Sequence, residues 1–312
     1  MKSNWVNNTH VEGYIFSHSL QARITGDQSK NPGTPFIQGI INVATDNDGM
    51  NVVPVSFTYV TERYSRSGKE NATYKVLQQI LSGTQNTFEE VGTSALKVRI
   101  DGDVEINDFL GRDGNMVAAK RVRGSFCHLA NDVNFEASFE TDMLIAETVM
   151  QEVEDGEDYM NVRGYAFNFR GDLLPVTYSI NNPDGIKYFE NCDISNNNPL
   201  LTRVWGNIIS TTIETKNEVE SAFGGPQVNI TTRTLRSWQI AGCAAEPYEF
   251  DDDSTITRDE LKVKLAERDE RVAAEKKRTE DYQASRNASA SAFAAPASNL
   301  TATASVSGDF KF

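Results

Sequence analysis

The sequence predicts a mainly β protein of two tandem five-stranded barrels, followed by a helix and a disordered tail. Three observations predict this fold class. Short motifs occur twice in the same order, each copy contains five strand-like runs around one short helix, and the composition changes sharply after residue 250. A chain of 312 residues is long enough for two domains that each bury a core. We expect these domains at residues 1–133 and 134–250.

The internal repeat rests on three pairs of segments that occur in one order. They are VPVSF at 53–57 and LPVTY at 174–178, RIDGDV at 99–104 and RVWGNI at 203–208, and GIINV at 39–43 and GYAFNF at 164–169. Three ordered matches indicate two copies of one fold with connections of different length.

The first copy alternates runs rich in β-branched and aromatic residues with Asn, Pro and Gly turn clusters. One stretch, with Val76, Ile80 and Leu81, has helical spacing instead. We expect strands at 11–24, 36–45, 52–60, 97–106 and 116–128, with a helix at 71–81. Three strands, a helix and two further strands is the element order of an OB fold, a small and partly open barrel.

The second copy has the same order with shorter connections. We expect strands at 139–151, 159–169, 174–180, 201–215 and 228–241, with a short helix or turn at 186–190. The boundary between the copies lies at about residues 131–136. Pro54 and Pro175 fall inside strand-like runs, which limits them to edge or bulge positions.

The C-terminal part differs from both copies. Thr257 and Glu260 form a capping-box pattern ahead of a stretch rich in Lys, Glu, Arg and Ala. We expect the segment 251–284 to contain a mostly solvated helix with a thin apolar stripe of Leu261, Leu265 and Val272. Residues 285–312 are expected to be a disordered tail that carries two aromatic residues at its tip.

Residues that could carry catalysis are scarce. The histidines have no Cys or carboxylate at metal-ligand spacing, and the sequence contains no P-loop, dinucleotide-binding fingerprint or nucleophile elbow. We therefore expect no enzyme, no cofactor and no metal. Four acidic residues alternate along the fourth expected strand and could share one face. An exposed solubilising face is their simplest interpretation, with a two-metal nuclease site as the alternative. This acidic row consists of Asp101, Asp103, Glu105 and Asp108.

The sequence shows neither a membrane-spanning run nor a secretory signal. Its three cysteines are odd in number and far apart, which indicates a reducing, cytosolic setting. The net charge is −14, of which residues 1–140 contribute −3 and residues 141–250 contribute −9. Such a balance disfavours nucleic-acid binding overall, although a local groove can still be positive.

Cations interleaved with aromatic residues favour single-stranded nucleic acid as the ligand, because phosphates need cations and bases stack on rings. In an OB fold the oligonucleotide crosses strands 2 and 3, between the loops that join strands 1–2 and 4–5. We expect the run at 63–69 and the turn at 111–114 to converge there. The expected contacts are Tyr59, Arg63, Tyr64, Arg66, Lys69, Tyr74, Phe109, Arg112, Lys120, Arg121 and Arg123 in the first copy, and Arg170, Trp205 and Arg233 in the second.

The segment LKVRIDGDV at 96–104, the turn GRDGN at 111–115 and the basic strand after it resemble strands 4 and 5 of single-stranded-DNA-binding proteins. The second copy is similar to phage or prophage proteins of this kind from Gram-positive bacteria. The resemblance implies an OB fold that coats exposed DNA during replication or recombination in the cytoplasm of a bacterial or phage-infected cell.

The resemblance also implies that the C-terminal tip recruits replication or recombination proteins. Here the tip would use Asp309, Phe310 and Phe312, although Lys311 departs from the acidic tip of the family. The alternative function is a phage structural or assembly protein whose β-barrels make protein contacts.

Overall fold

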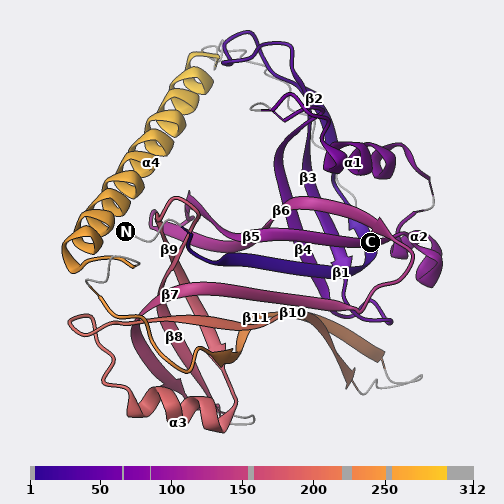
Figure 1. Ribbon diagram of the computed structural model, residues 1–312. Helices are drawn as coiled ribbons and strands as arrows, with labels where there is room; N and C mark the ends of the chain where they lie inside the picture. The colour runs from indigo at the N-terminus through magenta and orange to yellow at the C-terminus, as the bar shows by residue number, and fades with distance from the viewer. Residues whose placement is uncertain are drawn as a thin grey trace, which may run out of the picture.

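The computed structural model describes residues 4–64, 67–84, 86–153, 158–219, 227–250 and 255–293, with side chains described outside 212–233 and 286–293. The strands form two five-stranded barrels that lie side by side (Figure 1). Figure 1 also shows a long C-terminal helix running along the outside of both barrels. The predicted fold class is confirmed for this part of the chain.

The first barrel closes through five strands. β1 pairs with β3 and β5, β3 pairs with β4, β4 runs parallel to β6, and β6 pairs with β5. A helix lies between β4 and β5, which gives the OB order. The bounds are β1 Asn7–His18, β3 Pro35–Ala44, β4 Val52–Thr61, α1 Ala72–Ser82, β5 Lys97–Leu110 and β6 Met116–Ala130.

Three short elements of this barrel were not predicted. The run expected at 11–24 is interrupted after His18, and its end forms a separate strand at the edge of β3. A single helical turn and a 3-10 turn follow α1. The three are β2 Gln21–Ile24, α2 Phe88–Val91 and η1 Gly92–Ser94.

The second barrel repeats these connections with antiparallel β7–β8, β8–β9, β10–β11 and β10–β7 pairs and one parallel β9–β11 contact. Its bounds are β7 Glu136–Gln151, β8 Tyr159–Phe167, β9 Leu173–Ile180, α3 Pro183–Asn191, β10 Leu200–Val219 and β11 Gln227–Cys243. All three predicted pairs of repeated segments fall on equivalent strands, so the internal repeat is confirmed.

Pro54 and Pro175 occupy the positions that were predicted for them. Each faces an antiparallel partner on one side, while the parallel contact on the other side is limited to one or two residue pairs that exclude the proline. The missing N–H of each proline therefore breaks no ladder hydrogen bond.

The two barrels are joined by main-chain pairing. β1 pairs with β7 from Asn7–Thr141 to Glu12–Glu136, which makes one sheet of both barrels. A second contact joins the turn after β3 to β10, where the Ser210 amide donates to Oδ1 of Asn51 at 2.6 Å. The relative placement of the barrels is therefore fixed by backbone as well as by side chains.

Equivalent ion pairs, each with a buried carboxylate, link the first and fourth strands of each barrel. Arg99 on β5 binds buried Glu12 on β1, and Arg203 on β10 binds fully buried Asp142 on β7. Burial opposes the charged form of Glu12, but hydrogen bonds from Arg99 and His10 outweigh it and lower its pKa to about 2. The repeated arginines at 99 and 203 are thus structural.

A glycine follows three residues after each of these arginines, at a register irregularity. A Cβ on Gly102 would lie 2.0 Å from the carbonyl oxygen of Arg123, and a Cβ on Gly206 would lie 1.8 Å from that of Gln239. Both contacts are with main chain of the neighbouring strand, so no side-chain movement can relieve them.

We expect Gly206→Ala to lower the free energy of unfolding by about 1–3 kcal/mol, because the added methyl group forces β10 and β11 apart. Thermal unfolding measures this loss. The matched control is Gly26→Ala, since a Cβ there meets nothing within 4 Å and should change stability by less than about 0.5 kcal/mol. Equal melting temperatures for the two variants would show that the backbone contact is absent.

The C-terminal helix α4, Arg258–Phe293, extends nine residues beyond the predicted end at 284. Most side chains of its first turns are exposed, and two residues of the predicted apolar stripe cover the barrel: Leu261 is buried, and Leu265 packs against the same apolar cluster, which includes Trp5 and Phe167. Arg268 is also buried and binds Asp108 on β5 through two nitrogen atoms. α4 therefore ties the β5–β6 hairpin of the first barrel to the second barrel.

Among the residues that the structure describes, no helix is long and apolar enough to cross a membrane.

Candidate nucleic-acid interface

A groove lies along the end of β4 and the middle of β6, on the outside of the first barrel. It has a volume of about 590 Å³ and is called the β4–β6 groove below. Its lining consists of Asn31, Thr34, Pro35, residues 58–64, Asn71 and residues 123–126. Because β4 and β6 are parallel, with Val55 opposite Val122, the C-terminal residues of β4 lie beside the middle of β6.

Three half-exposed rings line the β4–β6 groove: Tyr59 (49% exposed), Tyr64 (39%) and Phe126 (51%). Tyr59 follows the last core residue of β4, Phe57, and its ring lies 4.8 Å from that of Phe36. Phe126 alternates with fully buried Cys127, which turns its ring outward. Each ring is available to a flat partner without unfolding any element.

The loop after β4 supplies cations beside these rings. The Tyr64 amide donates to the Lys69 carbonyl at 2.9 Å, and Gly68, at φ +64°, donates to the Tyr64 carbonyl at 2.8 Å. This turn holds Arg63 and Lys69 on the exposed side of the loop, and neither forms an ion pair with a carboxylate of the described residues. Arg66, also predicted here, lies outside the described residues.

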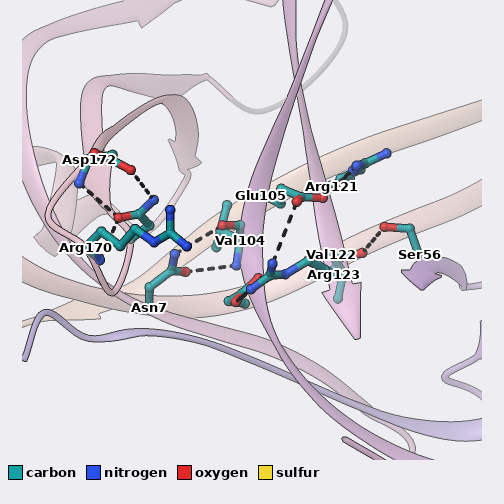
Figure 2. Close-up of polar contacts among 11 residues, drawn as sticks. Asn7, Ser56, Val104, Glu105, Arg121, Val122, Arg123, Arg170 and Asp172 are labelled. Carbon is teal, nitrogen blue, oxygen red and sulfur yellow. Dashed lines mark hydrogen bonds and ion pairs between the residues drawn. The ribbon is translucent and has the colours of Figure 1, made fainter. Parts of the chain in front are cut away.

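The cations on β6 are less available than the sequence indicated. Arg123 donates from Nε to Asp103 at 2.8 Å, and Arg121 donates from Nη2 to Glu105 at 2.6 Å. Figure 2 shows Arg123 also directed toward Glu105, 4.0 Å away. Burial raises the pKa of Asp103 although Arg123 opposes this rise. A phosphate would have to compete with these carboxylates.

The acidic row on β5 is accounted for by such pairs. Asp101 binds His10 at 2.6 Å, Asp103 and Glu105 bind the β6 arginines, and Asp108 binds Arg268 of α4. Asp108 lies on the other face of β5 from Asp103 and Glu105, because it is an odd number of residues from each of them along the strand. The described residues contain no group of three or more potential metal ligands. The row is structural, in place of the exposed face that was predicted.

The predicted convergence of the two loops is wrong. Arg63 follows the C-terminal end of β4. Phe109 lies near the end of β5, and Arg112 lies in the turn that leads into the start of β6. Since β4 and β6 run parallel, the end of one strand lies far from the start of the other. Figure 1 shows the β5–β6 hairpin reaching toward α4, at the opposite end from α1.

Two further predicted contacts lie elsewhere. Tyr74 on α1 packs against the apolar core, because it occupies the face of the helix that covers the barrel. Arg170 stands over the ring of Phe169, 5.1 Å from its centroid. Figure 2 shows Arg170 beside Asp172, in the β8–β9 turn of the second barrel. The side chain of Arg233 and the tip residues Asp309, Phe310 and Phe312 lie outside the part of the protein that is described.

Trp205 lines a second groove, between the barrels, that adjoins the β4–β6 groove at Ser125 and Phe126. Asp101 lines it as well, as expected from their equivalent positions in the repeat. Its other charged lining residues are acidic apart from His10, whose pKa is raised by hydrogen bonds to Asp101 and Glu12 in spite of burial. The acidic residues are Asp101, Asp103, Glu136 and Glu140. This groove repels phosphates, so Trp205 is poorly placed for DNA.

Sequence reasoning missed Phe126. Side chains alternate between the two faces of a strand, so Phe126 and its neighbour Cys127 point in opposite directions on β6. With Cys127 turned into the core, the ring of Phe126 points outward.

Lys120 lies in a separate cavity between the barrels, where Ile40, Trp238 and the main chain of β9 surround it.

The chain was compared with known proteins. A family model described as YorF matches residues 6–279. No curated protein matches. Among solved structures, the wild-type single-stranded DNA binding protein from Thermus aquaticus has 10% sequence identity and a TM-score of 0.47, over 81% of this chain and 97% of that chain. A deletion mutant of the same protein has the same identity and TM-score, over 80% and 99% of the two chains.

Proposed function

The chain belongs to the YorF family, and we propose that it binds single-stranded DNA without regard to sequence, through the β4–β6 groove of its first barrel. The observation that carries this proposal is the presence of three half-exposed rings beside Arg63 and Lys69, neither of which forms an ion pair within 4 Å among the described residues. Glu70 acts on Arg63 only through a longer electrostatic interaction. Bases stack on such rings whatever their identity, because every base has a π-face.

The groove favours single strands over duplex for a physical reason. In a duplex the bases already stack on one another, so their faces are not free to contact Tyr59, Tyr64 or Phe126. In a single strand the bases can turn toward these rings while the phosphates remain near Arg63 and Lys69. Each phosphate contact releases counterions, which makes the affinity depend on salt.

We further propose the setting that the sequence favours. Coating of exposed strands would support replication or recombination of DNA, in the cytoplasm of a bacterial or phage-infected cell. The tail that ends in Asp309, Phe310 and Phe312 would recruit other proteins to the coated strand. No covalent chemistry on the DNA is part of this proposal.

We expect the double variant Arg63→Ala/Tyr64→Ala to bind labelled oligo-dT about 10- to 1,000-fold more weakly, since one stacking ring and one phosphate contact are lost. The slope of log affinity against log salt should fall by about 0.7 for the lost cation. Fluorescence anisotropy at several salt concentrations measures both quantities.

The matched control is Lys187→Ala, which removes an exposed cation on α3 of the second barrel, away from both the groove and Lys120. It should leave the affinity unchanged. Wild-type affinity in the double variant, with the fold retained, would show that the groove has been misplaced.

A further inference from the structure

A cavity lined by cations lies between the two barrels. This inter-barrel cavity has a volume of about 650 Å³ and is lined from the first barrel by β3, β4 and β6 and from the second by β8 to β11. Such a volume is within the range of small-ligand sites. Lys120, Arg121 and Arg236 are among its described lining residues, and no Asp or Glu is. This is unusual in a chain whose net charge is −14.

Lys120 is the central polar group of the inter-barrel cavity. Its Nζ atom donates to the carbonyl oxygen of Thr177 at 2.5 Å and lies 4.4 Å from the ring centroid of Tyr178 and 4.8 Å from that of Trp238. No described carboxylate forms an ion pair with it. Burial among these groups lowers the pKa of Lys120 to about 7. An ammonium in such a place lacks the anion that would offset its desolvation.

The cavity and the β4–β6 groove share no lining residue, but they border neighbouring stretches of the same two strands. Residues 53–56 of β4 and 120–122 of β6 border the cavity, and residues 58–64 and 123–126 of the same chain segments border the groove. From Val53 to Thr61 the strand covers about 26 Å at roughly 3.3 Å per residue. A strand that lies in the groove can therefore enter the cavity by following β4 and β6.

We propose that the inter-barrel cavity takes one nucleotide of the bound DNA strand, with its base against Trp238 and its phosphate at Lys120. This inference rests on the proposed function and adds a second, enclosed subsite to it. A nucleotide within a DNA strand and a free mononucleotide both offer an aromatic base joined to a phosphate. A free mononucleotide is therefore the other ligand that the cavity could take.

A phosphate at Lys120 stabilises the ammonium form and raises its pKa in the complex above the value of about 7 in the free protein. Binding therefore takes up a proton, and the affinity falls as pH rises from about 7 to 8.5. The other ionisable groups that line the cavity with Lys120 are Arg121, its neighbour on β6, and Arg236, Tyr159 and Tyr178 across the cavity. The Glu147–Arg163 pair lies in the depression on its other side.

The test uses Lys120→Met in the full chain, which keeps an apolar stem and removes the charge. We expect affinity for oligo-dT at pH 7 to fall on the order of tenfold, the salt slope to fall by about 0.7, and the loss of affinity between pH 7 and 8.5 to disappear. Lys187→Met, at an exposed lysine of α3 that does not line the cavity, should behave as wild type. A purely structural role for Lys120 would leave the salt slope and the pH dependence in place.

Arg236→Gln is a second variant, because Arg236 is exposed and its replacement should not affect folding. It should also lower the salt slope. The contact of a base with Trp238 is measured by tryptophan fluorescence in a Trp205→Phe variant, which retains only Trp238 and the buried Trp5. The fluorescence of Trp238 should change on addition of oligo-dT.

The outcomes separate the two proposals. If wild type binds oligo-dT but Lys120→Met and Arg236→Gln keep its affinity, salt slope and pH dependence, the subsite is overturned and the proposed function stands. If wild type fails to bind oligo-dT, both fail. If thymidine monophosphate alone changes the fluorescence of Trp238 while oligo-dT does not, the cavity is a site for free nucleotides and the DNA subsite is overturned.

Discussion

An Asp142→Ala variant should lose about 3–5 kcal/mol of its free energy of unfolding, the largest effect on stability that we expect of a single substitution. Asp142 is fully buried, and its oxygens accept from Nε of Arg203 at 2.8 Å, from the Val6 amide at 2.8 Å and from the Tyr248 hydroxyl at 3.0 Å. Alanine would leave these three donors inside the protein without their acceptor.

These three partners come from distant parts of the chain. Val6 precedes β1 of the first barrel, Arg203 lies on β10, and Tyr248 follows the last strand of the second barrel. The substitution should therefore loosen the N-terminal segment and the segment leading to α4 together. Urea denaturation followed by circular dichroism measures the loss.

Glu147→Ala is the matched control for Asp142→Ala, because it removes a carboxylate of β7 whose partner Arg163 is about half exposed. Exposed pairs of this kind contribute about 0–1 kcal/mol. If both variants unfold at the same urea concentration, the buried carboxylate does not hold the second barrel together.

The double variant Tyr59→Ala/Phe126→Ala should show the largest loss of DNA affinity. Stacking on an aromatic side chain contributes about 1–3 kcal/mol per base, so two lost rings correspond to about 2–6 kcal/mol, or roughly 30-fold and upward. Both rings are about half exposed, and their removal leaves the barrel core untouched. Anisotropy titration with labelled oligo-dT gives the affinity, and thermal unfolding checks the fold.

Phe169→Ala is the control for this double variant. Phe169 is an exposed ring under a cation, Arg170, but it lies on the second barrel, outside the β4–β6 groove. Affinity should be unchanged in this variant. If Phe169→Ala lowers the DNA affinity more than the groove variant does, the DNA binds at the β8–β9 turn and not in the β4–β6 groove.

The fold was largely predictable from the sequence because the two barrels share motifs whose roles are geometric. Arg99 and Arg203 recur because each fourth strand supplies the partner of a buried carboxylate, and Gly102 and Gly206 recur because each approaches neighbouring main chain. Such constraints act on single positions and are therefore visible in a sequence as a repeat. The length of α4 was not visible in the same way, because weak apolar patterning does not fix where a helix ends.

The candidate site was predictable only where its residues are local. Arg63, Tyr64 and Lys69 lie in one turn, so their proximity follows from the sequence. The pairing of Arg121 and Arg123 with Glu105 and Asp103 depends on the strand register, which sequence patterning left open.

Contacts between distant segments of the chain could not be predicted from the sequence. Lys120 belongs to β6, but the groups that lower its pKa come from the second barrel, and Arg268 meets Asp108 across 160 positions of the chain. The expected meeting of Arg63 with Arg112 failed for a related reason. It required the direction of β4 relative to β6, which only the closed barrel determines.

The most direct measurement is a titration of wild-type protein against labelled oligo-dT and a matched duplex at about 50 mM and about 200 mM salt. We predict binding to the single strand alone, with an affinity that falls roughly tenfold or more between the two salt concentrations as about three phosphate contacts release their counterions. Equal binding to the duplex, an affinity that ignores salt, or no binding at all would contradict the presence of a cationic, ring-lined path for a single strand on this protein.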